Sequence, residues 1–162
     1  MEVRENIISI LVNNKPDVLA RIAGTFSGRG FNIESISANV MMNPAITKII
    51  ITTRGNKQTV TKMEKQLHKL VDVLQVDDLT DVDSACGEMI LIRIKLTEEN
   101  KGKVMKAINT YNWRVVSMDP SSCIVEVTGD KELIDDALAL LAPLGMDDFT
   151  RTGCIVLKRC KS

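Results

Sequence analysis

The chain has 162 residues, of which 44% are apolar and 26% are charged; this length and composition are typical of a soluble globular protein with one domain or two small ones. Its 21 basic and 21 acidic residues cancel, so the chain lacks the basic surface expected of a protein that binds nucleic acid or anionic lipid. Aromatic residues make up only 3%, so we expect a core of aliphatic side chains.

The sequence shows no signal for membrane insertion, secretion or metal binding. The N-terminus shows no apolar segment before a cleavage site, and the longest apolar stretch, 137–146, contains Pro143 and Gly145 and is too short to span a bilayer. None of the four cysteines forms a Cys-x-x-Cys pair, and His68 is the only histidine. We therefore expect a cytoplasmic protein with reduced thiols, no metal site and no membrane contact.

The first half of the chain alternates between apolar runs of strand length and stripes of helical spacing. Pro16 precedes one stripe and Gly28 follows it, as at the two ends of a helix. Met42-Asn43-Pro44 is a turn signal. We predict, in order, a strand at 7–12, a helix at 16–27, strands at 31–40 and 47–53, a helix with its apolar stripe from Val60 to Val71, and a strand at 73–76.

The second half repeats this order after an acidic segment that we predict to be a linker, at 79–86. Its expected elements are a strand at 89–96, a helix at 98–110, strands at 113–118 and 123–127, a helix at 129–142 and a strand at 152–157. Strand, helix, strand, strand, helix, strand is the ferredoxin-like order, which places helices on one face of an antiparallel sheet. The sequence predicts an α+β chain of two tandem ferredoxin-like domains, 1–78 and 87–162. The other face of each sheet must find a partner or be solvated.

The loop before the first helix has features of a site for a free amino acid. A helix N-terminus offers unpaired N–H groups and a partial positive charge to a carboxylate. Asn14, and Asn32 on the following strand, can each donate and accept hydrogen bonds, and Val18 and Ile33 are candidates for an aliphatic pocket. The same residues are also typical of a turn that only caps a helix, so spacing alone leaves both interpretations open.

Three segments resemble one known family. They are 14–19 (Asn-Lys-Pro-Asp-Val-Leu), 30–35 (Gly-Phe-Asn-Ile-Glu-Ser) and 64–73 (Glu-Lys-Gln-Leu-His-Lys-Leu-Val-Asp-Val). The first 80 or so residues resemble an ACT domain, a small module that binds amino acids. The chain as a whole is similar to the small, regulatory subunit of acetolactate synthase, closely to about residue 80 and weakly beyond it.

This resemblance implies a regulatory protein without catalytic residues. Members of the family bind a large thiamine-diphosphate-dependent catalytic subunit, raise its activity in the synthesis of valine, leucine and isoleucine, and make it sensitive to these amino acids, mainly valine. Thiamine diphosphate, Mg²⁺ and FAD are expected only in that partner. The effector lies between the ACT domains of a homodimer. The matching positions imply effector-binding roles for Asn14, Asp17, Val18, Leu19, Asn32 and Ile33.

Asp17 departs from the family, which usually has glycine at this position. Its side chain and charge lie where the carboxylate of the effector would approach the helix, so we predict valine binding weaker by about 1–2 kcal/mol, the scale of helix-terminus electrostatics. The alternative is that Asp17 simply caps the helix. Lys69 and Asp72 have the spacing of ordinary surface charges on the second helix, and His68 is interpreted as a solvated surface residue.

Three other functions are compatible with the predicted strand order or with an ACT-type module. An ACT-type sensor for another enzyme fits the same loop. An RNA-binding ferredoxin-like module needs aromatic residues on its exposed sheet face, whereas the third strand offers three isoleucines, Ile49, Ile50 and Ile51. An acylphosphatase-like enzyme needs an arginine and an asparagine around a phosphate, and Arg21 and Asn39 show no such arrangement. The strand at 31–40 is expected at an open sheet edge, where two copies can pair about a two-fold axis.

Overall fold

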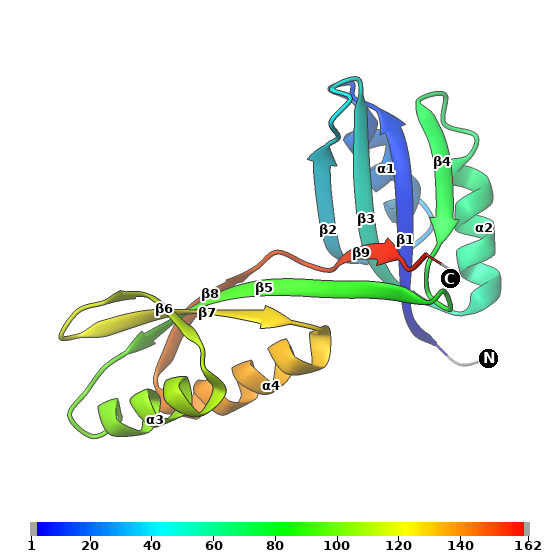
Figure 1. Cartoon of the computed structure of the whole chain (residues 1–162). Coiled ribbons are helices and arrows are strands. Elements are labelled where there is room, and N and C mark those ends of the chain that lie inside the picture. The colour runs from blue at the N-terminus through cyan, green and yellow to red at the C-terminus, as the bar shows by residue number, and fades with distance from the viewer. Residues whose placement is uncertain (1–2, 161–162) are drawn as a thin grey trace. The chain divides into compact units, whose positions relative to one another are not determined.

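The computed structural model describes residues 3–160 and divides the chain into two compact units (Figure 1). The first comprises the residues up to Ala85 together with those from Cys154 onward, and the second is Cys86–Gly153. In each unit, four antiparallel strands form a sheet with two helices on one face, and β9 (Ile155–Lys158) pairs in addition with β5 (Ser84–Lys95). The predicted α+β fold with two tandem ferredoxin-like units is confirmed.

The first unit has the strand order β2-β3-β1-β4, so β2 and β4 are its edges. Its elements are β1 (Arg4–Asn13), α1 (Val18–Ser27), β2 (Ile33–Val40), β3 (Ile46–Gly55), α2 (Lys57–Leu67) and β4 (Val73–Asp78). Alternate residues of β1 face the helices, since side chains along a strand point to opposite faces. The resulting core is mostly aliphatic, and its largest fully buried members are Ile8, Ile10, Ile22, Phe26, Ile49, Ile51 and Leu67.

Helix α1 begins two residues later than predicted. Pro16 and Asp17 belong to a turn in which the Val18 amide donates to the Lys15 carbonyl at 3.3 Å, and Asp17 is the N-cap residue. At the other end, Gly28 keeps helical backbone angles, and Gly30 has the positive φ, +72°, that turns the chain into β2. Glycine reaches this region without the steric cost of a Cβ atom.

The outer face of the first sheet is covered by the C-terminal segment of the chain. β9 (Ile155–Lys158) contributes Val156 to a second, smaller cluster of buried residues, whose other members are Ile50, Leu79 and Cys154, with Ile7 packed against them. Ion pairs of 3.2 Å from Lys158 to Asp77 and from Arg159 to Asp83 flank this cluster. The face opposite the helices therefore has a partner within the chain.

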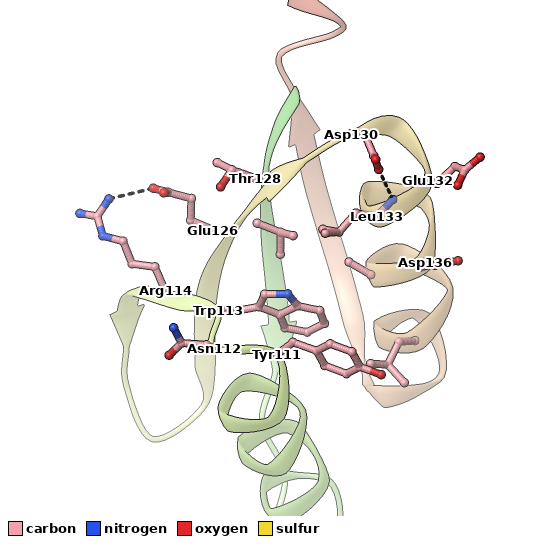
Figure 2. A pocket seen from close by; sticks show the side chains of 13 residues that line it. Tyr111, Asn112, Trp113, Arg114, Glu126, Thr128, Asp130, Glu132, Leu133 and Asp136 are labelled. Carbon is pink, nitrogen blue, oxygen red and sulfur yellow. Dashed lines mark hydrogen bonds and ion pairs between the residues drawn. The ribbon is translucent and has the colours of Figure 1, made fainter. Parts of the chain in front are cut away.

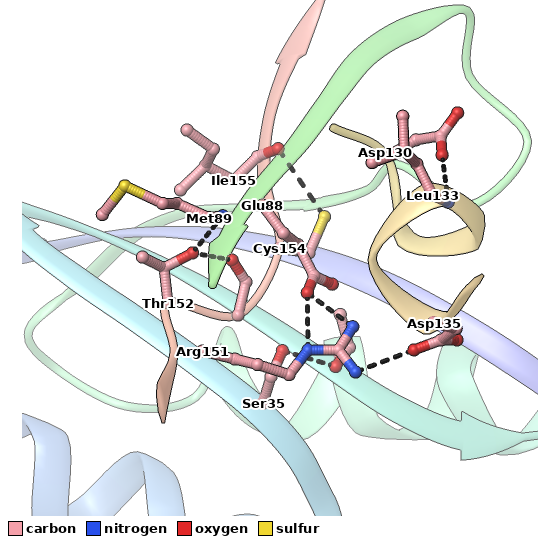
Figure 3. A network of polar contacts seen from close by, with 12 residues as sticks. Ser35, Glu88, Met89, Asp130, Leu133, Asp135, Arg151, Thr152, Cys154 and Ile155 are labelled. Carbon is pink, nitrogen blue, oxygen red and sulfur yellow. Dashed lines mark hydrogen bonds and ion pairs between the residues drawn. The ribbon is translucent and has the colours of Figure 1, made fainter. Parts of the chain in front are cut away.

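The second unit has the strand order β6-β7-β5-β8. Its elements are β5 (Ser84–Lys95), α3 (Lys101–Tyr111), β6 (Arg114–Met118), β7 (Ser122–Gly129), α4 (Lys131–Leu141), the short 3₁₀ helix η1 (Ala142–Leu144) and β8 (Met146–Arg151). Arg151 on β8 donates to Glu88 at 2.6 and 2.9 Å and to Asp135 at 2.8 Å, which ties the edge strand to β5 and α4 (Figure 3).

The end of the chain differs from the predicted single strand at 152–157. Gly145, at φ +95°, starts β8 directly after η1, and Gly153, at φ +77°, separates β8 from β9. β8 was missed because it is a polar edge strand without apolar alternation.

The segment 79–86, predicted to be a linker, consists of a turn with buried Leu79 followed by the start of β5. No helix in residues 3–160 is long and apolar enough to cross a membrane.

Candidate functional site

The loop between β1 and α1 is held at one end of the first sheet by Asn14. Its side-chain amide donates to the Pro44 carbonyl at 3.0 Å, and its backbone N–H donates to the Ala45 carbonyl at 2.8 Å. These bonds join the loop to the turn between β2 and β3. The side-chain oxygen of Asn14 accepts no hydrogen bond from any residue that the structure describes. The residue is exposed, so this oxygen is accessible to a ligand.

The N-terminus of α1 carries two free backbone donors. Within residues 3–160, the N–H groups of Leu19 and Ala20 donate to no carbonyl or side chain. The Val18 amide is bonded back into the preceding turn, and the Arg21 amide makes the first helical bond, to the Asp17 carbonyl at 3.1 Å. Two adjacent unpaired donors at the positive end of a helix suit an anion such as a carboxylate.

Asp17 does not cap the helix with its side chain. Its carboxylate instead lies 3.1 Å from the guanidinium Nε of Arg21, one turn further along α1. Its charge therefore stays near the helix N-terminus and is partly balanced by Arg21, while the Leu19 and Ala20 amides are left open. Asp17 is thus the N-cap residue by position, and it acts on the helix through its charge and not through a side-chain hydrogen bond.

Asp72 is the residue of this region that sequence reasoning missed. The prediction of an ordinary surface charge is wrong, since its side chain is only 5% exposed and lies in the loop between α2 and β4. It accepts hydrogen bonds from Lys15 at 2.7 Å, from the Arg21 guanidinium, and from the Asn13 side chain at 3.2 Å. Its backbone carbonyl also accepts from the Asn13 N–H at 2.8 Å. Asp72 thus anchors both the loop and the first turn of α1.

These partners favour the charged form of Asp72. The bonds from Lys15, then Arg21 and Asn13, hold the pKa of the carboxyl well below its usual range, and the bond to Asp72 raises the pKa of Arg21. The burial of Asp72 could not be predicted from the sequence, because the apolar stripe predicted a helix through residue 71. Helix α2 ends at Leu67, and the turns that follow carry Asp72 under the β1–α1 loop.

We expect the stabilising effect of Asp72 to disappear in acid. A carboxyl with a lowered pKa in the folded state contributes stability above its unfolded value, near 3.8, and loses it as the pH falls toward the folded value. Asp72→Asn should therefore lower the thermal unfolding midpoint at neutral pH, and the gap to wild type should narrow below about pH 4. Calorimetric unfolding of both proteins from neutral to acid pH measures the difference between their unfolding midpoints. An equal gap at neutral and acid pH would contradict the role of the Asp72 charge.

The three aliphatic candidates occupy different environments. Val18 is buried in the core of the first unit, and Ile33 is partly buried and packs against the same core. Leu19 is the one among them with a largely exposed side chain, at 43%. Leu19 is therefore available to contact a ligand directly, whereas Val18 and Ile33 set the position of the backbone around it.

A single chain does not bring Asn14 and Asn32 together. β1 and β2 are both antiparallel to β3, so they run parallel to each other. Asn14 follows the end of β1, whereas Asn32 precedes β2, which starts opposite Thr53 and ends opposite Thr47. At about 3.3 Å per residue, the two asparagines are separated by roughly 20 Å or more along the sheet. The side chain of Asn32 is exposed and has no partner among the described residues.

Comparison with known proteins identifies the family. A model of the AHAS small subunit-like ACT domain matches residues 8–75, and a model of the small subunit of acetolactate synthase matches residues 87–160. The probable acetolactate synthase small subunit of Methanothermobacter thermautotrophicus is 38% identical over 160 residues, which cover 98% of this chain and 95% of that protein. This chain belongs to the acetolactate synthase small-subunit family.

Other members of the acetolactate synthase small-subunit family are also similar to this chain over nearly its whole length. The small subunit of Aquifex aeolicus is 34% identical over 159 residues, which cover 98% of this chain and 83% of that one. The crystal structure of the small subunit from Thermotoga maritima superposes with a TM-score of 0.88 at 29% identity, covering 98% of this chain and 99% of that one. The first unit is therefore an ACT domain, as predicted, and the Asn14–Leu19 loop lies inside the matched region.

Proposed function

We propose that this chain is the regulatory subunit of an acetolactate synthase. It binds the thiamine-diphosphate-dependent catalytic subunit, raises its activity, and makes that activity sensitive to a branched-chain amino acid, foremost valine. The observation that carries the proposal is the pair of unpaired amides at Leu19 and Ala20, beside the free side-chain oxygen of Asn14. Family membership supports the choice of enzyme.

Each part of a zwitterionic amino acid has a complement in this loop. The effector carboxylate accepts from the Leu19 and Ala20 amides at the positive end of α1. The effector ammonium donates to the side-chain oxygen of Asn14. The exposed Leu19 side chain contacts the aliphatic group of the effector. The hydrogen bonds that Asp72 accepts from Lys15 and Arg21 hold the loop in place before the effector arrives, which lowers the ordering cost of binding.

The second half of the site comes from another copy of the chain. β2 is an edge strand whose outer side has no pairing strand among the described residues, and Ile36 and Val40 on it are exposed. Pairing two β2 strands about a two-fold axis runs them antiparallel, so the start of one β2 lies beside the end of the other. Asn32 of one protomer then approaches Asn14 of its partner, and each dimer has two equivalent sites.

This arrangement links effector binding to catalysis without any catalytic group in the chain. Because each site is shared, an effector stabilises one dimer geometry over others, and a catalytic subunit that prefers a different geometry responds. We assign effector binding and dimerisation to residues 1–78, and thiamine diphosphate, Mg²⁺ and FAD to the catalytic partner. We also propose that the complex works in the cytoplasm.

The test is a reconstitution with the purified catalytic subunit of the same organism. Acetolactate formation is measured with the catalytic subunit alone, after adding this chain, and after adding valine, leucine, isoleucine or, as a control, alanine. We expect activation by the chain and inhibition by a branched-chain amino acid but not by alanine. A chain that neither binds nor activates the catalytic subunit would contradict the proposal.

A further inference from the structure

The second unit contains a hollow of about 820 Å³ that none of the predicted effector residues lines. It lies between the end of α3, the strand β7 and the helix α4 (Figure 2). We call it the α3–α4 hollow and define it by its apolar lining, which consists of Tyr111, Trp113, Val127, Leu133, Ala137 and Leu140. A volume of several hundred cubic ångströms is large enough to take one or more side chains of a partner.

The aromatic side of the hollow contains the only tryptophan and the only tyrosine in the chain. Helix α3 ends at Tyr111, and Asn112 adopts the left-handed conformation, with φ 53° and ψ 41°, that reverses the chain. The Trp113 amide then donates to the Ile108 carbonyl at 3.0 Å, which returns the indole over the helix end. The two rings stack with centroids 5.1 Å apart and an interplanar angle of 17° (Figure 2).

The opposite wall is an exposed apolar stripe on α4. Leu133 and Leu140 are seven residues apart, so they lie on the same face of the helix, and they are 45% and 36% exposed. Val127 and Ala137 are buried beneath them and form the floor. Aromatic side chains next to a desolvated floor are typical of the centre of a protein–protein interface, where a few side chains carry most of the binding energy.

The rim of the hollow is acidic. Asp130, Glu132 and Asp136 lie along the first turns of α4, and Figure 2 shows Glu132 and Asp136 on the outer side of that helix. The one cation of the lining, Arg114, is paired with Glu126 at 2.8 Å. An apolar cleft with a net negative rim is complementary to an apolar side chain flanked by lysine or arginine.

We propose that the α3–α4 hollow docks a segment of the catalytic subunit that carries an apolar anchor residue between basic residues. This inference rests on the proposed function and locates its partner surface. A second copy of the chain is a poor occupant, because a two-fold contact through this hollow would place one acidic rim against the other. The ACT domain is then free to pair through β2, while the second unit holds the catalytic subunit.

The single tryptophan provides a direct probe of this surface. The full chain is labelled with 5-fluorotryptophan, so that it gives one fluorine resonance, from Trp113, and the unlabelled catalytic subunit is added. We expect this resonance to shift as the complex forms. The affinity of the complex, measured by surface plasmon resonance, should fall at least about tenfold in Leu133→Lys, which places a cation in the cleft opposite a basic partner. Asp136→Lys should mainly slow association.

Two exposed positions outside the hollow serve as matched controls. Leu91→Lys on β5 makes the same apolar-to-basic change, and Glu99→Lys makes a charge reversal like that at Asp136. Both should bind like wild type, and all four variants should keep the wild-type unfolding midpoint. An unmoved resonance in a complex that forms and is active would overturn the inference. So would a resonance that shifts with the concentration of this chain alone. Failure of the wild-type chain to bind the catalytic subunit would instead overturn the proposed function.

Discussion

Ile36→Lys is expected to leave the chain monomeric and to lower its affinity for valine at least about tenfold. Ile36 lies on the outer edge strand β2 and is 39% exposed, so the substitution places two like charges at the two-fold contact. A monomer keeps the Leu19 and Ala20 amides and loses Asn32 of the partner. A hydrogen bond to a charged ligand contributes roughly 1.5–3 kcal/mol, so losing the contact with Asn32 accounts for this decrease in affinity.

Sedimentation velocity at micromolar concentration and calorimetric titration with valine measure the two effects. Leu74→Lys is the matched control, because Leu74 is exposed on β4, the other edge strand of the same sheet. We expect this variant to remain dimeric and to bind valine normally. A monomeric Ile36→Lys variant with unchanged valine affinity would show that one chain holds the complete site.

Asp17→Gly is expected to bind valine about tenfold more tightly than the wild-type chain. The Asp17 carboxylate stays beside the unpaired amides of Leu19 and Ala20, where it opposes the carboxylate of the effector. Helix-terminus interactions of about 1–2 kcal/mol correspond to a roughly tenfold change in the affinity for valine. Arg21 balances part of this charge, and the effect should shrink at high salt, which screens the exposed Asp17 carboxylate from the effector.

Calorimetry on Asp17→Gly and Asp17→Asn separates charge from size. Asparagine keeps the shape of the side chain and removes its charge, so a purely electrostatic effect should appear equally in both variants. A larger gain in valine affinity in Asp17→Gly than in Asp17→Asn would show that the side chain also obstructs the effector. If all three proteins bind valine with the same affinity, Asp17 has no influence on the site.

The order of the elements could be predicted because it depends on local pattern. Apolar residues at helical spacing around Ile22 and Phe26, and Ile49 and Ile51 on one face of β3, become buried as the periodicity requires. The boundaries were less accurate, since they depend on turns such as the one over Lys15–Val18 that delays α1. The polar edge strand β8 has no apolar alternation to predict it.

The sequence by itself determined the two ferredoxin-like units and the loop with the donors of a helix N-terminus, because these follow from contacts between residues close along the chain. Only the tertiary structure decided that Asp72 is buried under that loop and that Val156 covers the outer face of the first sheet. It also decided that Asn14 and Asn32 lie at opposite ends of the sheet. Each of these depends on which distant strands pair and in which direction, and hydrophobic periodicity carries no information on that choice.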